Sequence, residues 1–87
     1  MFRIFVEDAK NNRRILAVEK TYEISKIKEI IKITQSIQGD IQIIFNGMIL
    51  EDSNTLEDYD IRPDDILCFY SEFLAGGKTI TNISNNN

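Results

Sequence analysis

The sequence predicts an α+β domain in which a mixed β-sheet packs on a single helix. Runs of alternating apolar and polar residues, the pattern of half-buried strands, occur near the N-terminus and again after residue 40. Between them lies a stretch whose apolar residues recur at the spacing of an amphipathic helix. The composition, 43% hydrophobic and 28% charged over 87 residues, is that of a folded domain with one modest core.

The first predicted element is an N-terminal hairpin. Residues 2–7 alternate in polarity, so every second side chain faces the core, namely Phe2, Ile4 and Val6. The other side of the same strand carries Arg3, Phe5 and Glu7. Residues 8–12 are rich in turn formers, and residues 14–19 have the pattern of the returning strand.

A helix of about three turns is predicted to begin at Ile24. Its apolar stripe consists of Ile24, Ile27, Ile31 and roughly Thr34. Candidates for the polar groups that start the helix are Thr21, Glu23 and Ser25. The dipeptide Gly39-Asp40 is predicted to end the segment.

The second hairpin has the strongest local signal in the chain. Residues 41–45 and 48–50 are apolar runs separated by Asn46-Gly47, a pair that accepts the positive φ angles of a type I′ turn. The turn-rich stretch that follows carries Leu56, Tyr59 and Ile61, a spacing that suits a short helical turn packed onto the core.

Residues 66–70 are predicted to form the last strand. Leu67 and Phe69 take its inward phase. Two strands, a helix, two strands, a loop and a fifth strand give the β-grasp layout, in which the helix crosses one face of a mixed sheet. The predicted core comprises Ile4, Val6, Ile24, Ile27, Ile31, Ile43, Leu50, Leu56, Ile61, Leu67 and Phe69.

We expect this domain to span residues 1–73. After it, residues 74–87 lose all periodicity and are predicted to form a flexible tail. The tail contains a diglycine at 76–77 and an extension over residues 78–87.

Composition argues against several classes of function. The chain has no histidine, the side chain most often used as a general base or metal ligand, and its single cysteine, Cys68, cannot form a metal-binding cysteine cluster. We therefore expect no enzyme, no metal site and no cofactor. The net charge is −4, and residues 51–65 hold seven acidic groups against Arg62 alone, which disfavours binding to nucleic acid.

The sequence also bears on location. No apolar run approaches the ~20 residues that span a bilayer. The N-terminus meets acid at Glu7 and Asp8 before the apolar segment of a signal peptide can form. We expect a monomeric protein of the cytoplasm or the nucleus that contacts no membrane.

Three stretches narrow the choice among β-grasp proteins. Residues 44–52 (IFNGMILED), 55–61 (TLEDYDI) and 74–77 (LAGG) resemble the strand–turn–strand, the Thr-Leu-x-Asp-Tyr-x-Ile loop and the terminal Leu-Arg-Gly-Gly of the ubiquitin family. Residues 1–77 align along their whole length, with small length changes. The resemblance implies that the Tyr59 hydroxyl ties the loop's backbone and that Lys28 pairs with Asp52.

The resemblance further implies a protein-binding patch on the outward face of the third and fifth strands. Its positions here are Ala9, Gln42, Ile44, Gly47, Cys68 and Tyr70. Alternation independently directs Ile44, Cys68 and Tyr70 away from the core. A few exposed apolar side chains are normal on any soluble protein. Three on adjacent strands favour a binding patch.

The chemistry implied by the resemblance lies in Leu74, Ala75, Gly76 and Gly77. Two glycines form an extended strand without side chains, which fits a narrow enzyme channel. Ten residues follow Gly77, so conjugation through its carboxylate requires prior cleavage after it. The implied partners are a processing protease, activating and conjugating enzymes, and domains that bind ubiquitin-like proteins.

Two alternatives stay open. A non-conjugated docking domain, or a fragment of a larger polyprotein, would bind partners through its sheet face, and residues 74–77 would then be a plain junction. A sulfur carrier of the β-grasp type would use a terminal diglycine as a thiocarboxylate. Such carriers lack the loop seen at residues 55–61 and usually end at the glycines.

Overall fold

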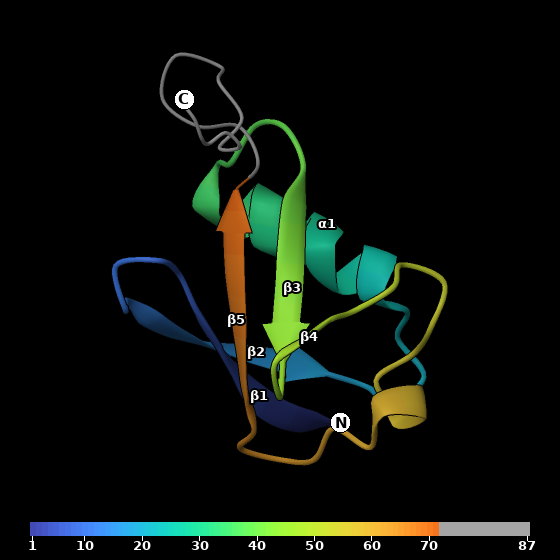
Figure 1. The fold of residues 1–87 in the computed structure, drawn as a ribbon. Coiled ribbons are helices and arrows are strands. Elements are labelled where there is room, and N and C mark those ends of the chain that lie inside the picture. Colours follow the sequence, from blue (N-terminus) through green and yellow to red (C-terminus); the bar gives the residue numbers. More distant parts are fainter. Residues whose placement is uncertain (72–87) are drawn as a thin grey trace.

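The computed structural model describes residues 1–71 of the chain. These residues form a five-stranded sheet with one α-helix across one of its faces, which confirms the predicted α+β class (Figure 1). The elements are β1 (Phe2–Glu7), β2 (Arg13–Val18), α1 (Ile24–Gln35), β3 (Ile41–Phe45), β4 (Met48–Ile49), the short 3-10 helix η1 (Glu57–Tyr59) and β5 (Ile66–Ser71). No helix among these residues is long and apolar enough to cross a membrane.

The sheet is mixed because its first and last strands, β1 and β5, lie side by side and run parallel. The strand order is β2-β1-β5-β3-β4. β1 and β5 run parallel, with Phe5 opposite Ile66, and the other neighbours are antiparallel. Residues about sixty positions apart in sequence therefore hold the centre of the sheet together.

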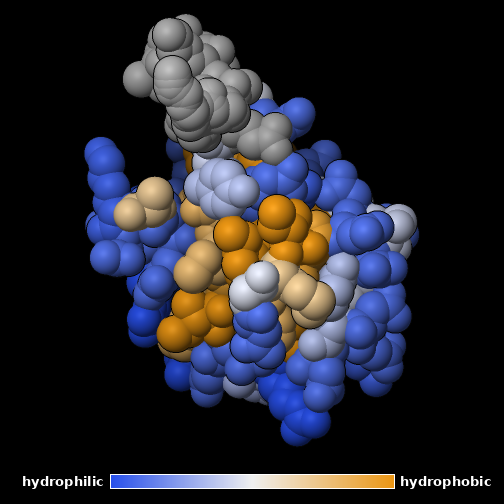
Figure 2. All heavy atoms as spheres, viewed as in Figure 1, coloured by the Kyte–Doolittle hydropathy of each residue, from blue (hydrophilic) through white to orange (hydrophobic). Residues whose placement is uncertain are grey.

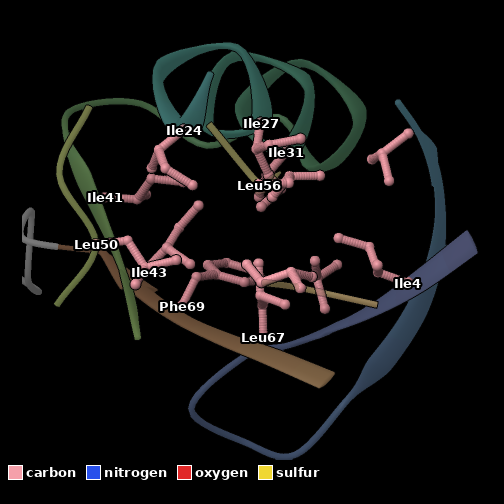
Figure 3. Packing of buried hydrophobic residues seen from close by; sticks show 13 residues of the cluster. Ile4, Ile24, Ile27, Ile31, Ile41, Ile43, Leu50, Leu56, Leu67 and Phe69 are labelled. Atoms are coloured by element: carbon pink, nitrogen blue, oxygen red, sulfur yellow. The ribbon is translucent and has the colours of Figure 1, made fainter. Parts of the chain in front are cut away.

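The core lies between this sheet and α1. All eleven predicted core residues are buried, and Figure 3 shows Ile24, Ile27 and Ile31 of the helix facing Ile43, Leu67 and Phe69 of the strands. Val18 and Ile41, which are not among the predicted core residues, are also buried. They lie at the ends of β2 and β3, in the same inward phase as Leu16 and Ile43.

The helix spans Ile24–Gln35, which confirms its predicted start and its predicted length of about three turns. Its last residue is Gln35, and Ser36 adopts a left-handed conformation with φ 55° while its N–H donates to the carbonyl oxygen of Ile33. The helix itself therefore ends before Gly39-Asp40, the dipeptide predicted to end the segment, and β3 begins directly after that dipeptide. A left-handed residue after a helix is most often glycine, so a serine there gave no signal.

Two smaller helix predictions also needed correction. Thr34 is exposed and its hydroxyl donates to the carbonyl oxygen of Ile30 at 2.9 Å, so it does not belong to the buried stripe. Glu23 occupies the N-cap position, but its side chain makes no capping hydrogen bond. Ser25 donates instead to the Glu23 carboxylate at 3.4 Å.

The connection from β4 to β5 is pinned by one aromatic side chain. The Tyr59 hydroxyl accepts hydrogen bonds from the backbone N–H of Glu51 at 2.8 Å and from Nδ2 of Asn54 at 3.1 Å. Leu56 and Ile61, on either side of η1, are buried. The predicted role of Tyr59 is therefore confirmed. The loop segment that it stabilises, from Leu56 to Ile61, leads the chain towards β5.

The predicted ion pair is also present. Nζ of Lys28 lies 2.5 Å from Oδ1 of Asp52, and the lysine side chain is 16% exposed against 63% for the aspartate. The pair ties α1 to the residues that follow β4. The backbone N–H of Ser25 makes a second link, because it donates to the carbonyl oxygen of Asp52 at 3.1 Å.

Candidate functional site

The face of the sheet opposite α1 collects most of the predicted patch residues. On β3 and β5, Ile44 lies directly opposite Cys68, and Gln42 lies opposite Tyr70. Residues opposite one another in a sheet share a face. The intervening pair, Ile43 and Phe69, is buried on the other face. Cys68 is exposed, while Gln42, Ile44 and Tyr70 are half-buried, so these four side chains form one outward surface.

Gly47 and Ala9 lie in turns at the ends of strands. Asn46 and Gly47 have φ angles of 54° and 76°, as the predicted type I′ turn requires, and Gly47 is exposed. A Cβ at Gly47 would meet nothing within 4 Å, so the backbone angle is the reason for glycine there. Ala9 is exposed in the turn after β1, whose last residue, Glu7, pairs with Cys68.

The turn that carries Ala9 is organised by Asp8. Its Oδ1 accepts the backbone N–H groups of Lys10 at 2.8 Å and Asn12 at 3.0 Å, and its Oδ2 accepts Nδ2 of Asn12 at 3.2 Å. Hydrogen bonds to a carboxylate favour its charged form. The hydrogen bond from the backbone of Asn12, more than any other, holds the pKa of Asp8 below its ordinary value.

The outward surface is wider than the predicted patch. In the sheet register Phe5 pairs with both Ile15 and Ile66, and Ile44 pairs with both Cys68 and Ile49. Because Ile66 and Cys68 are neighbours on one side of β5, the two rows join. We call the resulting surface the sheet-face band, which comprises Ile15, Phe5, Ile66, Cys68, Ile44 and Ile49.

The sheet-face band crosses all five strands. Ile15, Ile49 and Ile66 are 59%, 58% and 38% exposed. Figure 2, which looks onto this face, shows apolar residues gathered in one area with hydrophilic residues around it. Isolated exposed apolar residues are ordinary on soluble proteins, whereas a contiguous set indicates an interaction surface.

Ion-paired arginines border the band where it crosses β1. Nε of Arg3 lies 2.7 Å from Oδ1 of Asp64, and Nη2 of Arg13 lies 2.5 Å from Oε2 of Glu7. The guanidinium carbon of each arginine is 5.6 Å from the centre of the Phe5 ring, within the range of a cation–π contact. Phe5 is thus flanked by two cations, and the exposed apolar side chains of the band lie on either side of it, at Ile15 on β2, Ile66 on β5 and Ile49 on β4.

The chemical groups on this face suit contact with another protein. Cys68 is a free, exposed thiol. In residues 1–71 no group of three or more His, Cys, Asp or Glu side chains could hold a metal ion. An apolar area with a polar rim is the usual anatomy of a surface that binds another protein.

Sequence reasoning missed four members of the sheet-face band. Alternation already directed Phe5 outward, but Ile15, Ile49 and Ile66 gain significance only from their neighbours across the sheet. The outward phase of each strand was a usable signal. What the sequence lacked was the strand order that places these side chains next to one another.

The tail positions Leu74, Ala75, Gly76 and Gly77 lie outside the described residues, as does the predicted domain boundary at residue 73. The last described strand, β5, ends at Ser71. A family model described as the ubiquitin family matches residues 4–72, which cover nearly all of the described domain.

Proposed function

The chain belongs to the ubiquitin family, and on that premise we propose that it is a ubiquitin-like protein modifier made as a precursor. Cleavage after Gly77 releases the carboxylate that joins it to target proteins. It has no catalytic activity or cofactor of its own, and it works in the cytosol or the nucleus through a processing protease, activating and conjugating enzymes, and domains that bind its sheet face.

The observation that carries this proposal is the Leu74-Ala75-Gly76-Gly77 sequence, which begins three positions after the end of β5. The last described strand, β5, ends at Ser71. Two glycines then allow an extended backbone to enter an enzyme channel without side-chain collisions. The carboxylate of Gly77 is therefore the group that the activating enzyme would modify.

The proposed chemistry uses ATP supplied to the activating enzyme. The Gly77 carboxylate attacks the α-phosphate and forms an acyl adenylate, with loss of pyrophosphate. An enzyme thiolate then displaces AMP to give a thioester. Finally a lysine amine of the target displaces the thiolate and forms an amide, so every bond that breaks is matched by one that forms.

The test has two arms. The full-length chain is expressed in the cytosol of its own cell and weighed by mass spectrometry, and we expect a product that ends at Gly77. A tagged version that already ends at Gly77 is added to lysate with ATP, and we expect a ladder of heavier, tag-bearing species. A third sample without ATP controls for non-covalent association.

A second candidate function is a non-conjugated docking domain or a domain of a larger polyprotein. The sheet-face band favours it, because that surface can bind a partner without any use of the tail. Ubiquitin-like domains in general act through contacts with other proteins. Recovery of a chain still ending at Asn87, with no conjugates from the version ending at Gly77, would select this function over the first.

A further inference from the structure

A groove lies between α1 and the beginning of β3, away from the sheet-face band. Its volume is about 920 Å³, and its lining comes from the helix, from the connection that follows it and from β3. We call it the α1–β3 groove, and its apolar part consists of Ile33, Ile37 and Ile41. Ile41 is buried and Ile37 is half-buried, whereas Ile33 is 72% exposed. Exposed and half-buried aliphatic side chains that gather in one groove indicate a surface that a further segment can cover.

The last described residue lies near one end of this groove. Ser71, at the end of β5, is opposite Ile41 in the register of β3 and β5. Figure 1 shows the end of β5 beside the connection from α1 to β3. Ile41 therefore belongs both to the groove and to the place where the chain leaves the sheet.

The residues after Ser71 are long enough to reach the groove and to fill it. Residues 72–77 can span ~20 Å when extended, at about 3.3 Å a residue. α1 has 12 residues, which corresponds to a length of ~18 Å. Residues 78–83 match that length at about 3.1 Å a residue. The segment after the diglycine can thus lie along α1 while residues 72–77 cross the start of β3.

The extension has apolar side chains at a spacing that suits this groove. Residues 78–87 contain two isoleucines, Ile80 and Ile83. In a polyproline II conformation, which has three residues per turn, both lie on one face. Contact with the isoleucines of the groove would remove apolar surface from water on both sides. Residues 74–87 are predicted to lack structure of their own, and a segment of that kind can become ordered on a surface that fits it.

The charges of the groove also favour this occupant. Its lining has four acidic side chains and three lysines. Lys28 is paired with Asp52, which leaves three carboxylates and two ammonium groups. Asp40, at the end nearest Ser71, has no ion-pair partner within residues 1–71. The one charged side chain of the extension is Lys78, so the extension brings a cation and no side-chain carboxylate to this surface.

We propose that residues 78–87 of the uncut chain dock in the α1–β3 groove, with their two isoleucines against those of the groove and Lys78 next to Asp40. The contact is intramolecular, and the linker of six residues gives an effective concentration on the order of millimolar. The inference rests on the function proposed above in one respect, because cleavage after Gly77 then also uncovers the groove. Docking itself does not depend on cleavage.

The first test compares the amide NMR spectra of the full chain and of a chain that ends at Gly77, both purified without a processing protease. We expect shift differences at Ile33, Ile37 and Ile41 that do not change with protein concentration. Identical groove amides in the two chains, or differences located on the sheet-face band instead, would overturn the proposal. Differences that grow with concentration would show that a second copy fills the groove, which overturns it as well.

A synthetic peptide of residues 78–87 tests the same contact between separate molecules. Added to the chain that ends at Gly77, it should restore the groove shifts of the full chain. The dissociation constant should be about 1 mM or tighter, since the linker supplies an effective concentration of only about that size. A peptide with both isoleucines replaced by serine is the matched control and should cause no shift. Equal shifts from the two peptides would count against the proposal.

Substitutions in the extension identify its contact residues. Ile80→Ser combined with Ile83→Ser in the full chain should return the groove amides to their positions in the chain that ends at Gly77. Thr81→Ser, between the two isoleucines, should leave the groove amides of the full chain unchanged. Docking that survives the loss of both isoleucines would contradict the assigned contact.

The groove can be altered without unfolding the domain. Ile33→Ser should abolish the shift differences caused by the extension, and the fold should be retained because this side chain is 72% exposed. Ile49→Ser is the matched control, because Ile49 is 58% exposed and lies on the sheet-face band. It should leave docking intact, and loss of docking in this variant would argue for the other face.

The charge contact has its own test. Lys78→Glu should weaken docking, and Asp40→Lys in the same chain should restore it, because the two charges are then exchanged. A double variant that docks no better than Lys78→Glu alone would overturn the contact between these residues. Every comparison is made on chains that no protease has cut. Docking can therefore be observed even if cleavage after Gly77 fails, and cleavage can occur even if docking is absent.

Discussion

The Tyr59 hydroxyl lies 2.8 Å from the backbone nitrogen of Glu51, eight residues earlier, and accepts its hydrogen bond. The same oxygen accepts Nδ2 of Asn54 at 3.1 Å, so one phenol satisfies two donors of the loop. This contact holds η1 against the end of the second hairpin and fixes where the chain enters β5.

Replacing Tyr59 by phenylalanine should lower the free energy of unfolding by about 1–2 kcal/mol, because both donors lose their acceptor while the ring still packs. Urea unfolding followed by circular dichroism measures the change. Tyr70→Phe is the control, since no hydrogen bond of the Tyr70 hydroxyl occurs within residues 1–71. A similar loss in both variants would contradict the assigned role.

Truncation of Ile27 should be far more costly. Its side chain is fully buried between α1 and the sheet, and Ile27→Ala should reduce the free energy of unfolding by about 2–5 kcal/mol through lost burial and the cavity left behind. Ile33, on the same helix, is 72% exposed. Ile33→Ala should change the same quantity by less than about 0.5 kcal/mol, and thermal unfolding of the two variants tests the difference.

The sheet-face band predicts an opposite pattern for Ile44. Ile44→Ala should weaken binding to domains that recognise ubiquitin-like proteins, because the side chain lies on the outward face between Cys68 and Ile49. The cost in stability should be well below that of Ile27→Ala, because Ile44 is only half-buried. Calorimetric titration against a panel of such domains tests it, with Ile33→Ala as the surface control. Unaltered affinity for every binding domain would argue against the band.

The turn at residues 8–12 should respond to acid in a defined window. The pKa of Asp8 is held below the ordinary value of 3.8 by hydrogen bonds that exist only in the folded turn. The stabilisation is therefore fully present above the ordinary pKa and is lost as the pH falls through the lowered one. NMR titration of the Lys10 and Asn12 amides should report a midpoint below 3.8, and Asp8→Asn should abolish the transition.

The tail gives the last prediction. Gly76→Val should block processing after Gly77, because a β-branched side chain cannot follow the extended path that a diglycine takes through a narrow channel. The unfolding curve should stay that of the unmodified chain, since the last described strand ends at Ser71. Mass spectrometry of the expressed product reads the first effect. Normal cleavage of the valine variant would contradict the role assigned to the glycines.

Much of the fold could be predicted because its strands, helix and turn depend on patterns among residues close in sequence. Alternation placed Ile4 and Val6 on the core side of β1, and the helical spacing of Ile24, Ile27 and Ile31 gave α1 its buried stripe. The Asn46-Gly47 pair predicted its turn because few other residues accept two positive φ angles in succession. These features depend on residues close in sequence, which the chain specifies directly.

The end of α1 shows where local signals stop. The helix ends at Gln35, four residues before Gly39, because Ser36 takes the left-handed conformation that glycine takes more readily. The N–H groups of Ser36 and Ile37 donate to the carbonyl oxygens of Ile33 and Lys32, so backbone hydrogen bonds close the last turn. A serine with φ 55° therefore ends the helix without the glycine that would have signalled the end in the sequence.

The residue pattern is enough to assign the buried face of each strand, because side chains alternate with a period of two and the core removes apolar ones from water. Which strands are neighbours becomes visible only in the folded domain. The parallel pairing of Phe5 with Ile66 joins the ends of the domain and completes the sheet-face band. It also leaves Ile15 on an open edge. The periodicity of a strand shows which of its side chains face the core. Which strands lie side by side depends on backbone hydrogen bonds between residues far apart in the chain.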